Sequence, residues 1–264
     1  MTTGTDPLET LLATLGTSHA RLAAIVGPLT AEEVAGPSYD DDWSIAQVLS
    51  HLGSGAEIFG LLLEAGRRGA DAPGMEQFQP VWDRWNAKSP EEQARDGLAA
   101  DAAFLASLGR VDPVEREAWR LSFFGGERGL SDVIQMRLSE HAVHTWDVAV
   151  ARDSKATLAE DAVELILDTL PGYVPRVGKP TGENLRAYVI TYDPERRFRL
   201  DAAPESVSLS PADPSPLPPG SAVLRLPAEA FIRLVLGRLD DEHASGAETE
   251  NVNLAALRRL FPGF

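Results

Sequence analysis

The sequence predicts an α+β protein of two domains, a helical first half and a smaller mixed second half. Long segments with apolar residues at helical spacing fill the first half. After residue 151 the pattern changes to short alternating segments that are typical of strands. The chain also has 264 residues, more than the roughly 100 to 200 of one domain. We therefore expect one domain over residues 1–155 and a second over residues 156–264.

Four long helices are predicted in the first domain. They are expected over residues 8–26, 44–68 and 89–108, and from residue 130 or 131 onward. Ser44 followed three positions later by Gln47 forms a capping box, and Ser89 precedes Pro90 at a first helical position. The glycine-rich residues 123–129 are expected to be a loop. Four long helices joined by loops indicate a bundle.

The second domain is expected to combine short strands with helices. Strands are predicted over residues 186–192, 197–202, 206–210 and 222–226, and helices over 158–170, 228–239 and 254–260. A proline- and glycine-rich stretch at residues 171–182 separates the first helix from the strands, and residues 211–220 hold five prolines and must form a loop. The second domain therefore reads as a small α+β unit.

Composition excludes several classes of function. A formal net charge of −16 disfavours nucleic acid and anionic membranes as partners. We expect no membrane span and no signal peptide, and hence a cytoplasmic protein. The chain has no cysteine, so metal binding is left to histidines and carboxylates, and any thiol chemistry needs a thiol supplied from outside.

A metal site is predicted from three residues on two helices. Glu140 and His144 are four residues apart on a predicted helix and therefore point the same way. His51 lies about 90 residues upstream on another predicted helix. Two histidines and one carboxylate form a common catalytic site for a divalent metal with open positions. One alternative is that Glu140 and His144 form only a pair on the protein surface, and that His51 bonds to a backbone carbonyl. Another is that His141, three residues before His144, is a metal ligand.

Asp147, His19 and His243 are interpreted separately. Asp147 either orients a ligand imidazole or caps the following turn by solvation. His19 and His243 belong to no motif and are expected at the surface.

The motifs also resemble a known family. Residues 42–52 (DWSIAQVLSHL), 84–87 (RWNA), 140–147 (EHAVHTWD) and, more weakly, 231–238 (FIRLVLGR) carry the resemblance. In order and spacing they are similar to the mycothiol-dependent maleylpyruvate isomerase family, a branch of the DinB-like metalloenzymes. The resemblance covers nearly the whole chain, and the motifs around His51 and Glu140 are its specific part.

The resemblance implies a DinB-like four-helix bundle that holds zinc or another divalent metal through His51, Glu140 and His144. It also implies mycothiol as the thiol cosubstrate and an electrophilic small molecule as substrate. The thiolate adds to the substrate and then either leaves after a cis-trans isomerisation or stays attached, as in a thiol S-transferase. A non-catalytic metal- or ligand-binding module and a metal-dependent hydrolase remain alternatives. We expect a monomer or a homodimer.

Further site residues are expected around position 84 and in the second domain, where the role of Arg238 rests on the resemblance alone. Arg84 and Asn86 are expected to contact an anionic substrate, and Arg238 of the second domain is a candidate clamp for a substrate carboxylate. Trp82 and Trp85 are expected to border the thiol. The alternative for the residues around position 84 is aromatic packing beside a solvated arginine.

Overall fold

The computed structural model describes residues 6–40, 42–123 and 125–263 of the chain. It contains both helices and sheets and divides into two compact units, Met1–Ala156 and Thr157–Phe264. The mixed content of helix and sheet confirms the predicted fold class at this level.

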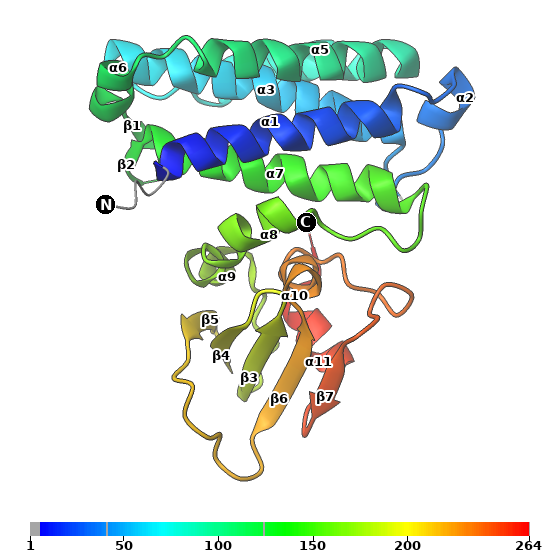
Figure 1. Ribbon diagram of the computed structural model, residues 1–264, viewed down its shortest axis with the longest axis vertical. Helices are drawn as coiled ribbons and strands as arrows, with labels where there is room; N and C mark the ends of the chain where they lie inside the picture. The colour runs from blue at the N-terminus through cyan, green and yellow to red at the C-terminus, as the bar shows by residue number, and fades with distance from the viewer. Residues whose placement is uncertain (1–5, 41, 124, 264) are drawn as a thin grey trace. The chain divides into compact units, whose positions relative to one another are not determined.

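The first unit is built from four long helices that lie side by side (Figure 1). These are α1 (Pro7–Val26), α3 (Ile45–Arg68), α5 (Pro90–Leu108) and α7 (Leu130–Val150), and the shorter elements are α2 (Ala31–Val34), α4 (Met75–Asn86), α6 (Pro113–Ala118), β1 (Arg120–Phe123) and β2 (Gly126–Gly129). The most extensive contacts join α3 to α5 and α1 to α7, whereas α3 and α7 touch over a smaller surface. The unit therefore consists of two closely packed helix pairs.

Local side chains determine where these helices begin. The Ser44 hydroxyl accepts from the Gln47 backbone, and the Gln47 side chain accepts from the Ser44 backbone, which confirms the predicted capping box. Ser89 begins α5 in the same way. The Asp132 carboxylate accepts from the Gly129 N–H at 2.8 Å and caps α7. These bonds satisfy backbone donors that the first turn of a helix leaves unpaired.

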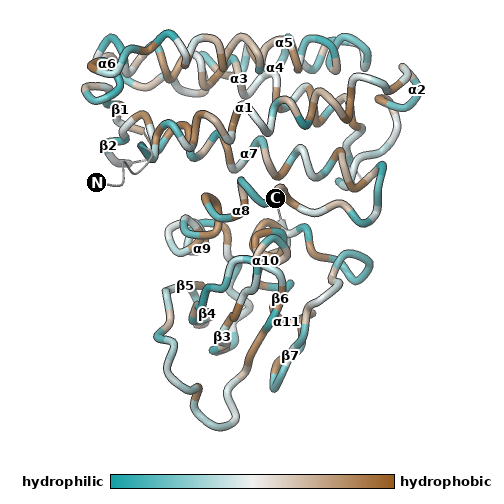
Figure 2. The backbone as a smooth tube through the Cα atoms, viewed as in Figure 1, coloured by the Kyte–Doolittle hydropathy of each residue, from teal (hydrophilic) through white to brown (hydrophobic). Residues whose placement is uncertain are grey.

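Small residues bring the helices of the first unit close together. A Cβ on Gly97 of α5 would collide with the Leu49 carbonyl of α3, and one on Gly53 would collide with the Trp85 ring. Leu49 and Ile134 are fully buried, and hydrophobic segments face one another across these helices (Figure 2). Burying each such side chain contributes about 1.5–3 kcal/mol. Apolar residues of all four long helices meet in one hydrophobic cluster, which includes Leu22, Leu49, Ala94 and Val148.

The sequence did not predict the shorter elements of the first unit. Residues 123–129, expected to be a loop, contribute to an antiparallel hairpin in which Leu121 pairs with Arg128, and residue 124 lies outside the described residues. Helix α4 was also missed, because Pro80 lies inside it. Its apolar residues Phe78, Val81 and Trp85 are buried at helical spacing, so packing against α3 stabilises a segment of weak intrinsic preference.

The second unit is a five-stranded sheet with helices. Its elements are α8 (Glu160–Leu167), α9 (Leu170–Val177), β3 (Leu185–Tyr192), β4 (Arg196–Ala203), β5 (Ser206–Pro211), β6 (Ala222–Pro227), α10 (Ala228–Val235), β7 (Glu248–Glu250) and α11 (Leu254–Leu260). The strand order is β5-β4-β3-β6-β7, and only β3 and β6 are parallel. Phe231 of α10 packs its ring 5.5 Å from that of Phe198 on β4. The four predicted strands are confirmed.

One helix of the described residues is long and apolar enough to cross a membrane by length and composition. This is α3, and 61% of its most apolar window is buried inside the structure. A core helix of a soluble protein passes the same test, so this helix is weak evidence for a membrane span.

Candidate metal centre

The three residues predicted as metal ligands lie together between α3 and α7. His51 Nε2 is 3.3 Å from Glu140 Oε2, and His144 Nε2 is 3.6 Å from the same oxygen. The two imidazole rings are 4.6 Å apart between centroids and meet edge to face. The possible ligand atoms all lie within 4.8 Å of one another. Helix packing thus brings His51 to the pair that local helical spacing already aligns.

The residues present fit a divalent metal. Zinc bound tetrahedrally at 2.0–2.1 Å places neighbouring ligand atoms about 3.3 Å apart, close to the measured separations of 3.3 and 3.6 Å. The side chains of His51 and Glu140 are 37% and 45% exposed, which leaves room for a further ligand. Two histidines and one carboxylate suit zinc and related metals. The geometry therefore meets the requirements of an open, three-ligand site.

The charges of the site favour cation binding. Burial alone raises the pKa of Glu140, but hydrogen bonds with His144 and His51 outweigh it and hold that pKa well below its usual range. Burial lowers the pKa of His51, although Glu140 partly opposes the shift. Glu140 is thus a carboxylate and His51 a neutral imidazole at neutral pH, the forms in which each binds a metal.

Asp147 and Trp43 complete the surroundings of the three residues. Asp147 is fully buried, and its Oδ2 lies 2.8 Å from His144 Nδ1. Burial lowers the pKa of His144, but the bonds with Asp147 and Glu140 outweigh it and raise that pKa. The Trp43 ring stacks on His144 and lies 5.3 Å from the His51 ring. Of the two readings of Asp147, the geometry favours the one that orients an imidazole.

Trp43 was not predicted as part of the site. Its position directly before the Ser44 cap is typical of a hydrophobic staple and does not indicate a site residue. The structure gives it this second contact because the start of α3 lies beside the end of α7, where Tyr39 N donates to the Asp147 carbonyl at 3.0 Å.

The other predicted site residues take separate positions. On α4, Arg84 pairs with Glu57, while Trp85 is buried and its Nε1 donates to Glu57 Oε1 at 2.9 Å. Asn86 is exposed at the end of α4, and Trp82 is half-buried with its ring 6.0 Å from that of Phe78. Among the described residues, the side chains that contact the His51 and His144 rings are Glu140, Asp147 and Trp43, and none of them lies on α4.

Arg238 belongs to the second unit. It follows α10, and its Nη1 donates to the Leu236 carbonyl at 3.0 Å. Its side chain is half-buried. The substrate-clamp role of Arg238 stays a prediction.

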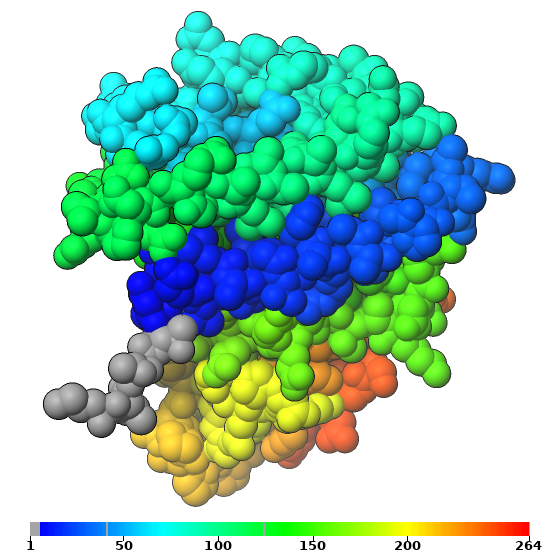
Figure 3. Space-filling model, turned by 45° about the horizontal axis from the view of Figure 1, so that its top comes forward, coloured from blue at the N-terminus to red at the C-terminus, as the bar shows by residue number. Residues whose placement is uncertain are grey.

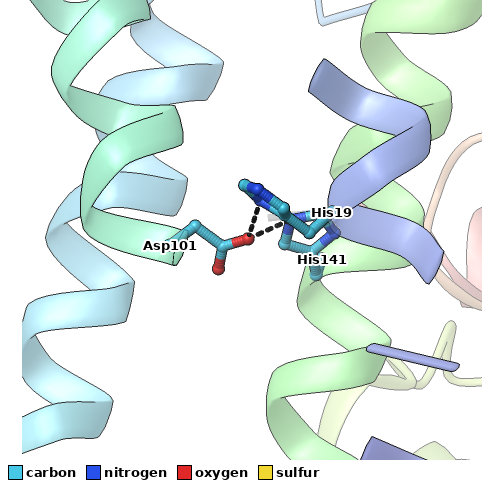
Figure 4. Close-up of side chains that lie close together, drawn as sticks. All are labelled: His19, Asp101 and His141. Carbon is cyan, nitrogen blue, oxygen red and sulfur yellow. Dashed lines mark hydrogen bonds and ion pairs between the residues drawn. The ribbon is translucent and has the colours of Figure 1, made fainter. Parts of the chain in front are cut away.

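A second polar cluster, here called the buried cluster, consists of Ser18, His19, Asp101, Arg137 and His141. His19 was expected at the surface, and this is wrong: its side chain is only 20% exposed, and its Nδ1 lies 2.8 Å from Asp101 Oδ2 (Figure 4). The reason is that α1 packs beside α5 (Figure 3), which places His19 against a buried carboxylate. The same prediction for His243 of the second unit is also wrong, since its side chain is 14% exposed. His141, expected to be a neighbour of the ligands, belongs to this cluster.

Comparisons with known proteins identify the family and the fold. Residues 15–149 match the family described as the mycothiol maleylpyruvate isomerase N-terminal domain. Two solved structures, the mycothiol-dependent maleylpyruvate isomerase and a mutant of it with one histidine changed to alanine, each share the fold with a TM-score of 0.68 at 16% identity, over 93% of both chains. No curated protein matches the chain. The family match spans half of the residues of this chain. The chain therefore belongs to the mycothiol maleylpyruvate isomerase family.

Proposed function

We propose that this chain is a metal- and mycothiol-dependent enzyme that adds a thiolate to an electrophilic small molecule. The reaction is either thiol S-transfer or a cis-trans isomerisation of the maleylpyruvate type. The observation that carries the proposal is the convergence of His51, Glu140 and His144 from two helices, at separations suited to one metal. Family membership supports the thiol as cosubstrate.

The bound metal would lower the pKa of a coordinated thiol so that the thiolate, the competent nucleophile, predominates at neutral pH. The residues of the chain prepare this chemistry. Glu140 supplies negative charge. Asp147 accepts a hydrogen bond from Nδ1–H of His144, which leaves Nε2 of His144 as the nitrogen that would bind the metal. The Trp43 ring covers one side of both imidazoles. The chain holds no cysteine, so the thiol has to come from a cosubstrate.

The remaining parts of the proposal concern the metal, the domains, the other site residues and the setting of the protein. We propose zinc as the metal, a DinB-like four-helix bundle over residues 1–155, and an α+β domain over residues 156–264. Arg84, Asn86 and Arg238 are proposed to contact the substrate. Trp82 and Trp85 are proposed to border the thiol. Location in the cytoplasm, and a monomer or homodimer as the assembly, complete the proposal.

Metal content tests the site directly. Purified protein is expected to hold about one divalent metal per chain by elemental analysis, and His51→Ala, Glu140→Ala and His144→Ala are expected to lose it. His243→Ala is the matched control, because that imidazole bonds to Asp240 in the second unit. This variant is expected to keep its metal. Retention of the metal in His51→Ala would contradict the ligand assignment.

Turnover then separates the possible reactions. The metal-loaded protein is incubated with maleylpyruvate or monochlorobimane, with and without mycothiol. Consumption that needs mycothiol supports the proposal, and the product identifies isomerisation or S-transfer. Product formed without thiol indicates a hydrolase that activates water. Metal-loaded protein without any turnover indicates a binding module.

A further inference from the structure

The buried cluster joins all four long helices of the first unit. Ser18 and His19 come from α1, Asp101 from α5, and Arg137 and His141 from α7, while α3 takes part through the Leu52 carbonyl. Figure 4 shows the Asp101 carboxylate pointing toward His19 and His141, with one of its oxygens, Oδ2, meeting both imidazoles. Arg137 lies three residues before the ligand Glu140, and Leu52 directly follows the ligand His51. The cluster is therefore beside the candidate metal centre.

Arg137 is the central contact of the cluster. Its side chain is 1% exposed, and Nη2 donates to Asp101 Oδ1 at 2.7 Å and to the Leu52 carbonyl at 2.9 Å. Both protons of that nitrogen are therefore used, one toward α5 and one toward α3. Asp101 is equally buried. A buried carboxylate and a buried guanidinium each need the other, since removing one leaves an uncompensated charge.

The distances favour a network of hydrogen bonds and ion pairs over a second metal site. Asp101 Oδ2 lies 2.8 Å from His19 Nδ1 and 3.0 Å from His141 Nε2. Both are shorter than the roughly 3.3 Å between neighbouring ligands of a tetrahedral zinc. The Arg137 guanidinium already compensates the negative charge of Asp101. A metal cation is therefore not needed to balance that charge.

The order Ser18, His141, Asp101 also resembles the arrangement of a serine hydrolase, with the Ser18 hydroxyl 2.8 Å from His141 Nδ1. All three residues are at most 1% exposed. A substrate cannot reach a nucleophile at that depth, so the cluster is not a hydrolytic site.

We propose that Arg137 and Asp101 are positioning residues that hold α3 against α7, so that His51 faces Glu140 and His144. This proposal rests on the metal site of the proposed function. The contact between α3 and α7 is less extensive than the α3–α5 and α1–α7 contacts, so packing alone constrains it less. Arg137 spans it and fixes the residue next to His51.

The backbone of α3 is shaped for this contact. A Cβ on Gly55 would lie 2.9 Å from Arg137 Nη1. The guanidinium cannot move away freely, because Asp101 and the Leu52 carbonyl hold it. On the same helix, a Cβ on Gly60 would meet no atom within 4 Å. The two glycines therefore offer a matched pair of substitutions.

The first experiment replaces the ion pair by apolar residues, in Asp101→Leu/Arg137→Met. Such replacements are often neutral for stability when both charges are removed together. We expect the metal-free double variant to melt within a few degrees of wild type but to bind Zn²⁺ about 10- to 100-fold more weakly, the range known for supporting residues of metal sites. Arg137→Lys keeps the positive charge, and we expect its Zn²⁺ affinity to lie between those of the double variant and the wild type. Lys88→Met/Asp96→Leu, an ion pair elsewhere in the unit, is the control with unchanged affinity.

The second experiment compares Gly55→Ala with Gly60→Ala. We expect Gly55→Ala to weaken Zn²⁺ binding and to alter the visible spectrum of the Co²⁺-loaded protein, which reports coordination geometry. Gly60→Ala is expected to leave both unchanged.

Four outcomes decide the proposal. Weaker metal binding in folded Asp101→Leu/Arg137→Met and in Gly55→Ala supports it. Wild-type affinity in both variants, with metal lost in His51→Ala, overturns the positioning role and leaves the proposed function standing. Metal-free wild type that resists loading overturns both. Two metals per chain, one of them lost in His141→Ala, would make the cluster a metal site and also overturn the proposal.

Discussion

Removing the Asp147 carboxylate tests whether His144 is held as a metal ligand. Asp147 is fully buried, and its Oδ2 lies 2.8 Å from His144 Nδ1. A hydrogen bond to a charged group of this kind contributes about 1.5–3 kcal/mol. Its main effect is to hold a proton on Nδ1, which leaves Nε2, the nitrogen on the Glu140 side, as the one available to a metal.

We expect Asp147→Ala to weaken Zn²⁺ binding about 10- to 100-fold, which corresponds to roughly 1.4–2.7 kcal/mol. This agrees with the value of the lost hydrogen bond. Asp147→Asn is expected to lose less, because its amide oxygen still accepts the Nδ1 proton. The measurement is a competition titration of the metal-free protein against a chromophoric chelator, with the melting temperature recorded alongside.

The chain offers a matched control for this experiment. His243 and Asp240 are also three residues apart and bonded at 2.8 Å, but they lie in the second unit. Asp240→Ala should keep the wild-type affinity. Wild-type affinity in folded Asp147→Ala, in a protein that loses its metal in His144→Ala, would refute the reasoning.

Three further predictions concern stability. Gly66→Ala should cost about 1–3 kcal/mol by overpacking, since its Cβ would collide with the buried Trp119 ring; a melting temperature no lower than that of Gly60→Ala would contradict this. Leu49→Ala should cost about 2–5 kcal/mol by leaving a cavity in the core, measured by urea unfolding. Burial raises the pKa of Asp101, but bonds with His141 and His19 outweigh it and hold that pKa below its ordinary value. The ionised carboxylate therefore contributes its full stabilisation above about pH 4 and loses it in stronger acid. In Asp101→Asn, the free energy of unfolding should fall less steeply as the pH is lowered.

Features that depend on neighbours in the chain were predictable. The capping box at Ser44 and Gln47 formed as expected, because its two bonds span only three residues. The alignment of Glu140 with His144 follows from the helical repeat. The strands of the second unit also follow from local alternation and from the prolines that interrupt it.

Other features were missed because their cause lies far away in the chain. Helix α4 has weak intrinsic preference and is held by burial of residues such as Trp85. His19 looked like a surface residue, since nothing near it in sequence shows that Asp101 would face it across 82 positions. Arg137 gave no signal either, because an arginine on a helix is usually solvated.

The sequence by itself determined the secondary structure of the long helices and the direction shared by Glu140 and His144, since both depend on periodicity and capping within a few residues. Only the tertiary structure decided that His51 reaches this pair, that Trp43 stacks on it, and that Arg137 and Asp101 are buried beside it. The physical reason is that these contacts depend on how the helices pack and on their relative register, which local sequence does not specify.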